Sequence, residues 1–152
     1  MGIATIGLDN FNDYYSVEFK RARATHLKKT AGVDVVELDL CDQKGLTKLM
    51  GKHLFTHVVH LAAQPGVRYS IEHPLEYVER NGKCFVTLLE AVVAQKPNDR
   101  PYFVYASSSS VYGLNEKVRC GWGDPCQLPW DQKSWMTLTK CFGTLTILPG
   151  HH

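Results

Sequence analysis

Short β-branched and aromatic runs alternate with helical patterns over the first two thirds of this chain, and this alternation limits the possible folds. Four runs have the character of strands: Ile3–Leu8, Asp34–Leu38, His57–Ala62 and Tyr102–Ala106. Helix formers that follow a candidate N-cap, Ser16, predict a helix over residues 16–29. Apolar spacing predicts two more, over residues 43–52 and 74–95. Alternation of this kind is typical of βαβ units, whose parallel strands need helices on both faces. We therefore predict an α/β fold with a parallel sheet.

The composition is that of an ordinary globular protein, with 44% hydrophobic and 21% charged residues in a chain of 152. The net charge of +2 gives no reason to expect nucleic acid as a partner. No apolar run approaches the roughly 18 residues of a membrane span and no signal-peptide pattern opens the chain, so we expect it to be soluble as it stands. The five cysteines form no C-x-x-C pair, which favours a reducing compartment.

The run Tyr102–Gly113 is the most informative segment for function. Its apolar residues indicate a buried strand, and four hydroxyls, Ser107–Ser110, follow directly. In an open parallel sheet, ligands bind just beyond the carboxyl ends of the strands. The serines therefore stand where a cofactor and a sugar would lie, although a serine-rich turn is an equally good interpretation of the run by itself.

Polar residues also follow the other predicted strands. Asp9 ends the first strand, where a carboxylate in a dinucleotide-binding fold accepts hydrogen bonds from the adenosine ribose and disfavours a 2′-phosphate. A turn aspartate is the alternative. His57 and His60 point to opposite faces of one strand, so they cannot share a metal ion, and we expect no metal site.

Three strings together resemble one known family. They are "GLDNFNDYY" at residues 7–15, "HLAAQPGVRYS" at residues 60–70 and "SSSSVYGLNEK" at residues 107–117. They are similar to segments of the extended short-chain dehydrogenase/reductases (NAD-dependent epimerases and dehydratases), and within them of the UDP-glucuronate 4-epimerases. The resemblance covers Ile3–Lys117. It implies an incomplete Rossmann-like, doubly wound parallel sheet in residues 1–118, with an unassigned tail over residues 119–152.

The resemblance implies NAD as cofactor and assigns a role to individual residues. The cofactor-binding set is Asp9 and Asn10 at the ribose, Asp39 and Leu40 at the adenine, Leu61, Ala62, Ala63 and Gln64 along the diphosphate and nicotinamide ribose, and Asn81 and Ser107. Ser108 matches the catalytic hydroxyl that bonds the C4 oxygen of the sugar. Arg68, Ser109 and Ser110 match substrate-binding positions. For Asp39 a helix-capping role, for Arg68 a plain surface position and for Asn81 a structural role are the alternatives.

The implied reaction is the NAD-dependent C4 epimerisation of UDP-glucuronate to UDP-galacturonate, by homodimers that in plants are typically Golgi-membrane enzymes. Two motifs of the family do not occur in this sequence: the Gly-rich turn that binds the pyrophosphate and the catalytic Tyr-x-x-x-Lys. We therefore expect this polypeptide neither to bind NAD at micromolar concentrations nor to turn over substrate.

A non-catalytic, partner-binding remnant is the alternative. A dehydratase is disfavoured, because dehydratases carry an acidic pair where Ser109 and Ser110 stand. One hypothesis for the tail is that Asp124–Trp135 is read one nucleotide out of register.

Overall fold

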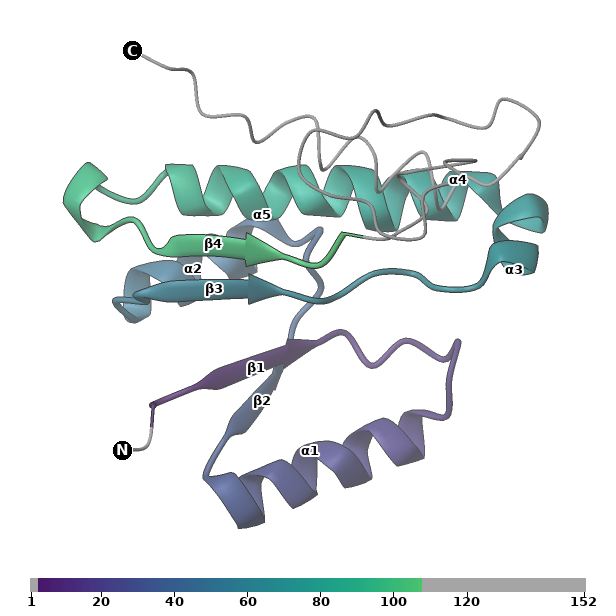
Figure 1. Ribbon diagram of the computed structural model, residues 1–152, viewed down its shortest axis with the longest axis horizontal. Helices are drawn as coiled ribbons and strands as arrows, with labels where there is room; N and C mark the ends of the chain where they lie inside the picture. The colour runs from purple at the N-terminus through teal and green to yellow at the C-terminus, as the bar shows by residue number, and fades with distance from the viewer. Residues whose placement is uncertain (1–2, 108–152) are drawn as a thin grey trace, which may run out of the picture.

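A computed structural model of the chain describes residues 3–107 (Figure 1). Its strands are β1 (Ile6–Asp9), β2 (Asp34–Glu37), β3 (His57–His60) and β4 (Tyr102–Tyr105). Its longer helices are α1 (Val17–Ala31), α2 (Gln43–Lys52) and α5 (Cys84–Val93). Shorter helical segments are α3 (Val67–Glu72), α4 (Pro74–Tyr77), the π-helix η1 (Val78–Lys83) and the 3₁₀ turn η2 (Pro97–Asp99). The predicted alternation of strands and helices is confirmed.

The strands form two parallel pairs, β1 with β2 and β3 with β4. Within the described part of the chain, no strand of one pair is hydrogen-bonded to a strand of the other. The carbonyl oxygen of Asp9 accepts from the Leu38 amide of the β2 side, and that of Thr56 accepts from the Tyr102 amide of β4. Alternate residues of a strand direct their backbone groups to opposite edges, so within residues 3–107 β1 and β3 each keep one edge without a partner strand. The predicted incomplete parallel sheet is therefore confirmed.

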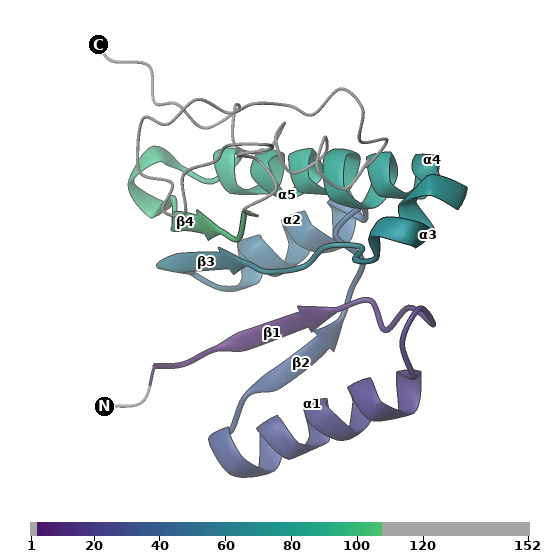
Figure 2. The same cartoon turned by 45° about the vertical axis from the view of Figure 1, so that its right-hand side comes forward.

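The hydrophobic core lies between α2, α5 and the β3–β4 pair (Figure 2). Its buried members are Leu46, Met50, Leu88, Ala91 and Val92, and partly buried residues from all four strand regions, including Leu8, Leu38, Val58 and Phe103, pack against them. The spacing of Leu46 and Met50 by four places both on one face of α2, as the sequence pattern predicts. This helix–sheet layer holds most of the apolar burial.

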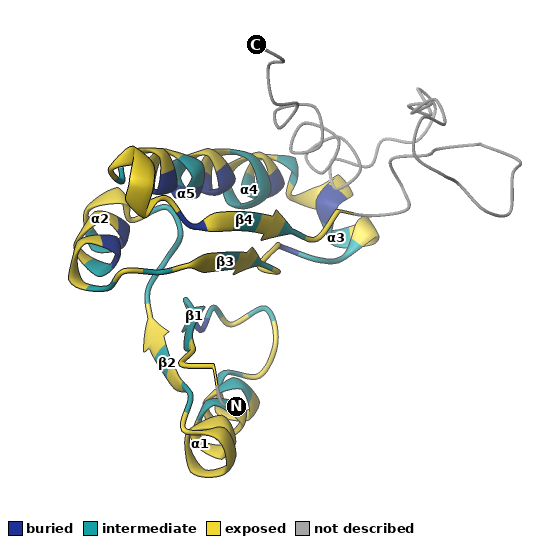
Figure 3. Cartoon of the chain, turned by 60° about the vertical axis from the view of Figure 1, so that its left-hand side comes forward, coloured by how far each residue is buried: buried dark blue, intermediate teal, exposed yellow. Residues whose placement is uncertain are grey.

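The helix α1 is the least buried of the long elements, and none of its own residues is buried (Figure 3). Its ends are well defined nevertheless. The Ser16 hydroxyl accepts a hydrogen bond from the Phe19 amide at 3.3 Å, which confirms Ser16 as the N-cap. Gly32 ends the helix in the left-handed conformation at φ +66°, which glycine adopts without steric cost. Local capping rather than burial therefore fixes α1.

The predicted helix over residues 74–95 is not a single regular helix. It begins at Pro74 as α4, widens into the π-helix η1 and continues as α5 to Val93. A π-helical turn holds an extra residue, and such turns are frequent at functional sites. No helix among residues 3–107 is both long and apolar enough to cross a membrane.

Truncation of a core side chain tests the placement of the core. The Leu46 side chain is 1% exposed and Leu54 is 82% exposed. We expect Leu46→Ala to lower the free energy of unfolding by about 2–5 kcal/mol, because it removes buried methyl groups and leaves a cavity. Leu54→Ala, the same chemical change at the surface, should alter it by no more than about 0.5 kcal/mol. Urea denaturation measures both values, and equal effects would contradict this core.

Candidate functional site

The carboxyl ends of the four strands and the segments that follow them carry the residues predicted to bind the cofactor. Asp9 ends β1, Asp39 lies two residues beyond β2, Leu61 directly follows β3, and Ser107 lies two residues beyond β4. The strands of each pair run parallel, so within a pair these ends lie at the same edge (Figure 1). The structure thus places both halves of the predicted site where ligands of open α/β sheets bind.

A tight turn after β1 fixes the Asp9 carboxylate. Asp9 Oδ1 accepts a hydrogen bond from the Phe11 amide at 2.7 Å and lies 3.5 Å from Lys20 Nζ. Phe11 has a φ of +49°, an uncommon value for a bulky residue. Its ring is buried and lies 4.6 Å from the guanidinium carbon of Arg21. Asp9 therefore has the role of a turn aspartate, which was the alternative to ribose binding. Its second oxygen, Oδ2, makes no hydrogen bond to any described residue.

The Asp39 carboxylate joins three separate segments. Oδ2 accepts from Asn10 Nδ2 at 2.9 Å and from Arg80 Nη1 at 2.6 Å. Oδ1 accepts from the Cys41 amide at 2.8 Å. Burial works to raise the pKa of Asp39, but the hydrogen bonds from Asn10 and Cys41 and the charge of Arg80 outweigh it and hold the pKa below its usual value of 3.8. Asp39 is therefore an ionised acceptor at neutral pH.

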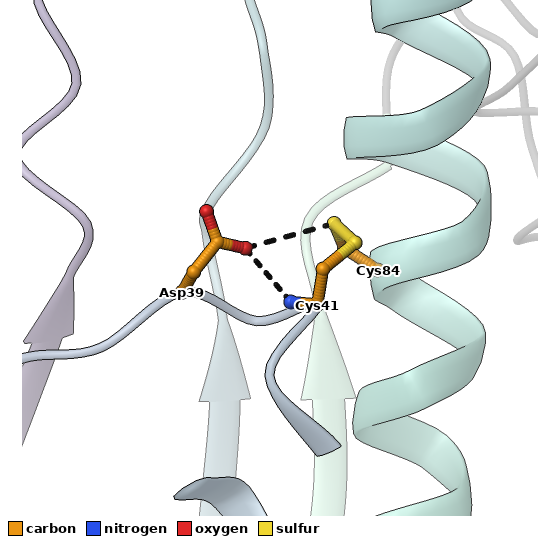
Figure 4. Close-up of side chains that lie close together, drawn as sticks. All are labelled: Asp39, Cys41 and Cys84. Carbon is orange, nitrogen blue, oxygen red and sulfur yellow. Dashed lines mark hydrogen bonds between the residues drawn. A yellow bond between two sulfur atoms is a disulfide. The ribbon is translucent and has the colours of Figure 1, made fainter. Parts of the chain in front are cut away.

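Asp39 does not cap α2, which was the alternative role for it. The N-cap is Asp42, whose side chain accepts from the Gly45 amide at 3.0 Å. The carboxylate of Asp39 instead turns toward the start of α5, where Cys84 Sγ lies 3.9 Å from Oδ1 (Figure 4). Asp39 is thus available for a role at the strand ends rather than in the helix.

Cys41 and Cys84 are joined by a disulfide (Figure 4). The expectation of reduced cysteines is wrong for this pair, because the fold brings together two residues 43 positions apart that no local spacing connects. Asp39, Cys41 and Cys84 place three potential ligand atoms within 4.8 Å of one another. Metal ions bind thiolates rather than disulfide sulfurs, so this trio is not a metal site in the bonded state.

Gln64 connects the turn after β3 with η1. The Asn81 side chain is bonded to both backbone groups of Gln64: Oδ1 accepts from the amide at 2.7 Å, and Nδ2 donates to the carbonyl at 3.1 Å. The Gln64 side chain is 3% exposed, and its Oε1 accepts from Asn12 Nδ2 at 3.4 Å. Gln64 Nε2 is buried without an acceptor among the described residues. The Gln64 side chain also acts on the Tyr77 phenol, where it works to lower the pKa of Tyr77, so Tyr77 is a polar neighbour of this buried amide.

A pocket of about 30 Å³ lies beside this turn. It is lined by His60, Ala62, Ala63, Asn81, Phe85, Tyr105 and Ala106. Burial lowers the pKa of the His60 imidazole from its usual value of 6.5, and the ring stacks on Phe85 with centroids 5.2 Å apart. His60 is therefore neutral at physiological pH and acts as an aromatic wall.

Gly66 shapes the turn that follows Gln64. Its φ is +102°, and a Cβ at this position would lie 2.2 Å from Tyr14 Oη. The phenol of Tyr77 donates to the carbonyl oxygens of Pro65 and Gly66. Burial raises the pKa of Tyr77 to about 12, so this donor keeps its proton. Only glycine fits here without displacing Tyr14.

The remaining predicted residues have different surroundings. Leu40 packs against the core cluster, and Leu61 is 72% exposed. Arg68 is exposed on α3 and has no ion pair with another residue of the described range. Ser108, Ser109 and Ser110 lie outside the described residues. The structure thus brings Asn10 against Asp39 and Asn81 against Gln64, and it does not describe the residue assigned to catalysis.

Several residues of this edge were not predicted from the sequence. They are Asn12, Lys20, Cys41, Tyr77, Arg80 and Cys84. Arg80 stands beside the predicted Asn81, but regular helical spacing would point the two in different directions. The sequence shows no signal for a π-helix, so the joint use of residues 80 and 81 was not visible.

Comparison with known proteins agrees with this arrangement. The sequence model of the GDP-mannose 4,6-dehydratase family matches residues 2–127. UDP-glucuronate 4-epimerase 1 of Arabidopsis thaliana is 54% identical over 117 residues, which are 77% of this chain and 27% of the relative. UDP-glucuronate 4-epimerase 3 of the same plant is 55% identical over the same length, 26% of that relative. The chain thus spans about a quarter of the length of these relatives.

Solved structures share the fold at low sequence identity. A UDP-glucose 4-epimerase from Bifidobacterium longum, in complex with NAD⁺ and UDP, matches with a TM-score of 0.77 and 19% identity. The match covers 94% of this chain and 40% of that one. A dTDP-glucose 4,6-dehydratase from Streptomyces venezuelae with bound NAD matches with a TM-score of 0.75 and 22% identity, over 93% of this chain and 40% of the other. Both likenesses support the Rossmann-like architecture.

The buried imidazole gives a pH test. The unfolded chain protonates His60 near its usual pKa of 6.5, whereas the folded chain does so only at lower pH. The unfolded state binds more protons in that interval, so the stability that neutral His60 contributes is complete above pH 6.5 and is lost as the pH falls toward the folded pKa. We expect His60→Gln to flatten the decrease in unfolding free energy between about pH 7 and pH 5. Urea denaturation at a series of pH values measures the unfolding free energy. Leu54→Ala, at an exposed position without a titrating group, should keep the wild-type slope, and equal slopes in both variants would contradict the assignment.

The Asp39 junction gives a second test with a matched control. Asp39→Asn keeps the side-chain shape but leaves Arg80 beside a neutral acceptor, so we expect a loss of about 1–3 kcal/mol in unfolding free energy. Asp34→Asn removes the carboxylate of an exposed ion pair with Lys28 and should cost at most about 1 kcal/mol. Chemical denaturation of the two variants measures both losses of unfolding free energy. Equal losses would show that the junction is no stronger than a surface pair.

Proposed function

The chain belongs to the GDP-mannose 4,6-dehydratase family, and on that premise we propose that it forms the nucleotide-binding edge of an NAD-dependent epimerase that converts UDP-glucuronate to UDP-galacturonate. The observation that carries the proposal is the gathering of Asp9, Asp39 and the Gln64–Asn81 pair beyond the carboxyl ends of parallel strands. The identity of 54% to a plant UDP-glucuronate 4-epimerase supports the choice of substrate.

The residues present fit the adenosine half of NAD. Asp9 Oδ2 is without a hydrogen bond to the rest of residues 3–107, which leaves an acceptor for a ribose hydroxyl. Asp39 is ionised and half-buried, as an acceptor for an exocyclic amine should be. Gln64 Nε2 is a buried donor without an acceptor in the described structure, at the turn where the resemblance expects the diphosphate and the second ribose. Asp9 Oδ2 is thus the carboxylate oxygen that has no hydrogen bond within the described residues, whereas both oxygens of Asp39 already accept one.

When bound, NAD would supply hydride transfer at C4 of the sugar. The residues of this chain would bind NAD and the sugar and hold them in position. Asp9 and Asp39 hold the adenosine end, and Ala62 and Ala63 allow the cofactor to approach the backbone closely. Ser108 would hold the C4 oxygen in position for proton transfer. Arg68, with no ion-pair partner in the described range, would pair with the uronic carboxylate, beside Ser109 and Ser110.

The 152-residue polypeptide contains no Tyr-x-x-x-Lys sequence, the pair that removes the proton in the family. We therefore propose that this polypeptide is inactive when isolated and that activity requires residues that it does not contain. A non-catalytic, partner-binding role is the second candidate, favoured by the open edges of β1 and β3. A homodimer and a Golgi-membrane location, as in the family, belong to the same proposal and are tested by sedimentation and by microscopy.

A segment exchange tests the proposed function. Residues 3–113 replace the matching segment of UDP-glucuronate 4-epimerase 1 from Arabidopsis thaliana, which supplies everything else. We expect the chimera to convert UDP-glucuronate to UDP-galacturonate, whereas the unaltered 152-residue polypeptide should give no product. Coupled chromatography of the sugar nucleotides measures both. A chimera that folds, as judged by its cooperative melting, and yet shows no conversion would contradict the proposal.

Variants within the chimera separate the roles. Asp9→Asn should weaken NAD binding by about tenfold, the loss of one charged hydrogen bond. Ser108→Ala should lower kcat by about 10²–10⁴-fold with little change in NAD affinity. Asp34→Asn, an exposed carboxylate on the amino-terminal end of β2, is the matched control and should leave both quantities unchanged.

A further inference from the structure

We propose that Cys41 and Cys84 form a reversible thiol–disulfide modification site that sets the position of the Asp39 carboxylate. The partner is a small dithiol reductant and its disulfide. The inference about nucleotide affinity rests on the role proposed above for Asp39, but the modification itself does not.

The disulfide lies at the point where two segments meet. Cys41 belongs to the loop between β2 and α2, and Cys84 is the first residue of α5, directly after the π-helix η1. The same loop is joined by the ion pair of Asp39 and Arg80, at 2.6 Å, to η1, which leads directly into α5. The covalent bond and the ion pair therefore fasten one loop to one helix, side by side.

Both sulfur-bearing residues contact the same carboxylate oxygen. Asp39 Oδ1 accepts from the backbone amide of Cys41 at 2.8 Å and lies 3.9 Å from Cys84 Sγ (Figure 4). When the bond is broken, the two sulfurs must separate to at least van der Waals contact, and both neighbours of Oδ1 shift. A loosened Cys41 amide would hold Oδ1 less firmly, so the state of the sulfurs controls the carboxylate.

The two sulfurs differ in access, which decides the direction of attack. Cys84 is 2% exposed, whereas Cys41 is only half-buried. A thiolate of the dithiol attacks Cys41 Sγ and forms a mixed disulfide, and Cys84 leaves as a thiolate that takes a proton from water. The second thiol of the reductant then displaces Cys41, which also gains a proton. Two electrons pass to the protein sulfurs, and the reductant leaves as its cyclic disulfide.

The consequence concerns the adenosine end of the proposed site. With the bond intact, Asp39 is held by Asn10, Arg80 and the Cys41 amide in one orientation. With the bond reduced, the loop of residues 39–42 loses its covalent link to α5 and keeps only the ion pair with Arg80, so the acceptor for the adenine amine is held less firmly. The oxidised form is therefore the form with the higher nucleotide affinity.

The first experiment uses the 152-residue protein and needs no nucleotide. A proteolytic digest without reductant, followed by mass spectrometry, should yield a linked peptide pair that contains Cys41 and Cys84. Amide hydrogen exchange by NMR then compares the protein with and without dithiothreitol. We expect protection of the Cys41 amide to fall by about tenfold or more on reduction, because its hydrogen bond to Asp39 opens. The Phe11 amide, which makes the equivalent bond to Asp9, is the internal control and should keep its protection.

The double variant Cys41→Ser/Cys84→Ser is the matched control for other effects of the reductant. In this variant the backbone amide at position 41 should exchange at the rate seen in the reduced protein, and that rate should not change when dithiothreitol is added. Absence of the linked peptide, or equal protection of the Cys41 amide in both redox states, would overturn the proposal. Recovery of the protected state when the dithiol is replaced by its disulfide is expected, and a failure to recover would exclude a reversible site.

Nucleotide affinity is measured separately, in the chimera described above. Reduction should weaken NAD binding by about tenfold, as measured by calorimetry, and the double-serine chimera should bind with the weaker affinity in either condition. If the amide of Cys41 responds and NAD affinity does not, the modification site stands and the assignment of Asp39 to adenine fails. If the chimera binds and turns over substrate but the amide does not respond, the proposed function stands and the switch fails.

Discussion

The ionised Asp39 carboxylate is the constraint on which the arrangement of this protein depends. The two strand pairs of residues 3–107 share no backbone hydrogen bonds, so side chains must hold the strand ends in register. Asp39 accepts from Asn10 beyond β1, from Cys41 in its own loop and from Arg80 in η1. Taking a carboxylate partly out of water is unfavourable unless its oxygens are paired, and here both oxygens are paired by donors from different segments. Removing any one of those donors therefore disturbs the others.

The π-helix explains how one segment can serve several partners at once. Arg80 reaches Asp39, Asn81 reaches Gln64 and Cys84 is bonded to Cys41. An extra residue in the helical turn changes the angle between successive side chains, so neighbouring positions can face the same edge of the sheet. The apolar face of α5 meanwhile remains on the core through Leu88, Ala91 and Val92. One helix thus supplies polar contacts at its amino-terminal end and hydrophobic contacts along the rest of its length.

Sequence reasoning predicted the elements better than the contacts between them. The helix Gln43–Lys52 and the N-cap Ser16 were found because apolar spacing and capping are local signals. The position of Asp9 followed from the rule that strand ends carry the site, and those of Asp39 and Gln64 followed from the family resemblance. The disulfide, the Asp39–Arg80 pair and the buried side chain of Gln64 could not be predicted, because each depends on packing between segments far apart in the sequence. The first strand was placed three residues too early at its start, since exposed Ile3 has the same β-branched character as Ile6.

The division of the strands into two pairs has a thermodynamic consequence. Asp9 and Asn10 belong to one pair, and Gln64, Ala62 and Ala63 follow a strand of the other. A ligand that contacts both groups would bridge parts of the molecule that share no backbone ladder. Because any molecule that binds the folded state alone raises the free energy of unfolding, such a ligand would stabilise the fold as well as fill a site. Ligand affinity and fold stability are then linked, and the melting temperature should rise with the concentration of such a ligand once that concentration exceeds its dissociation constant.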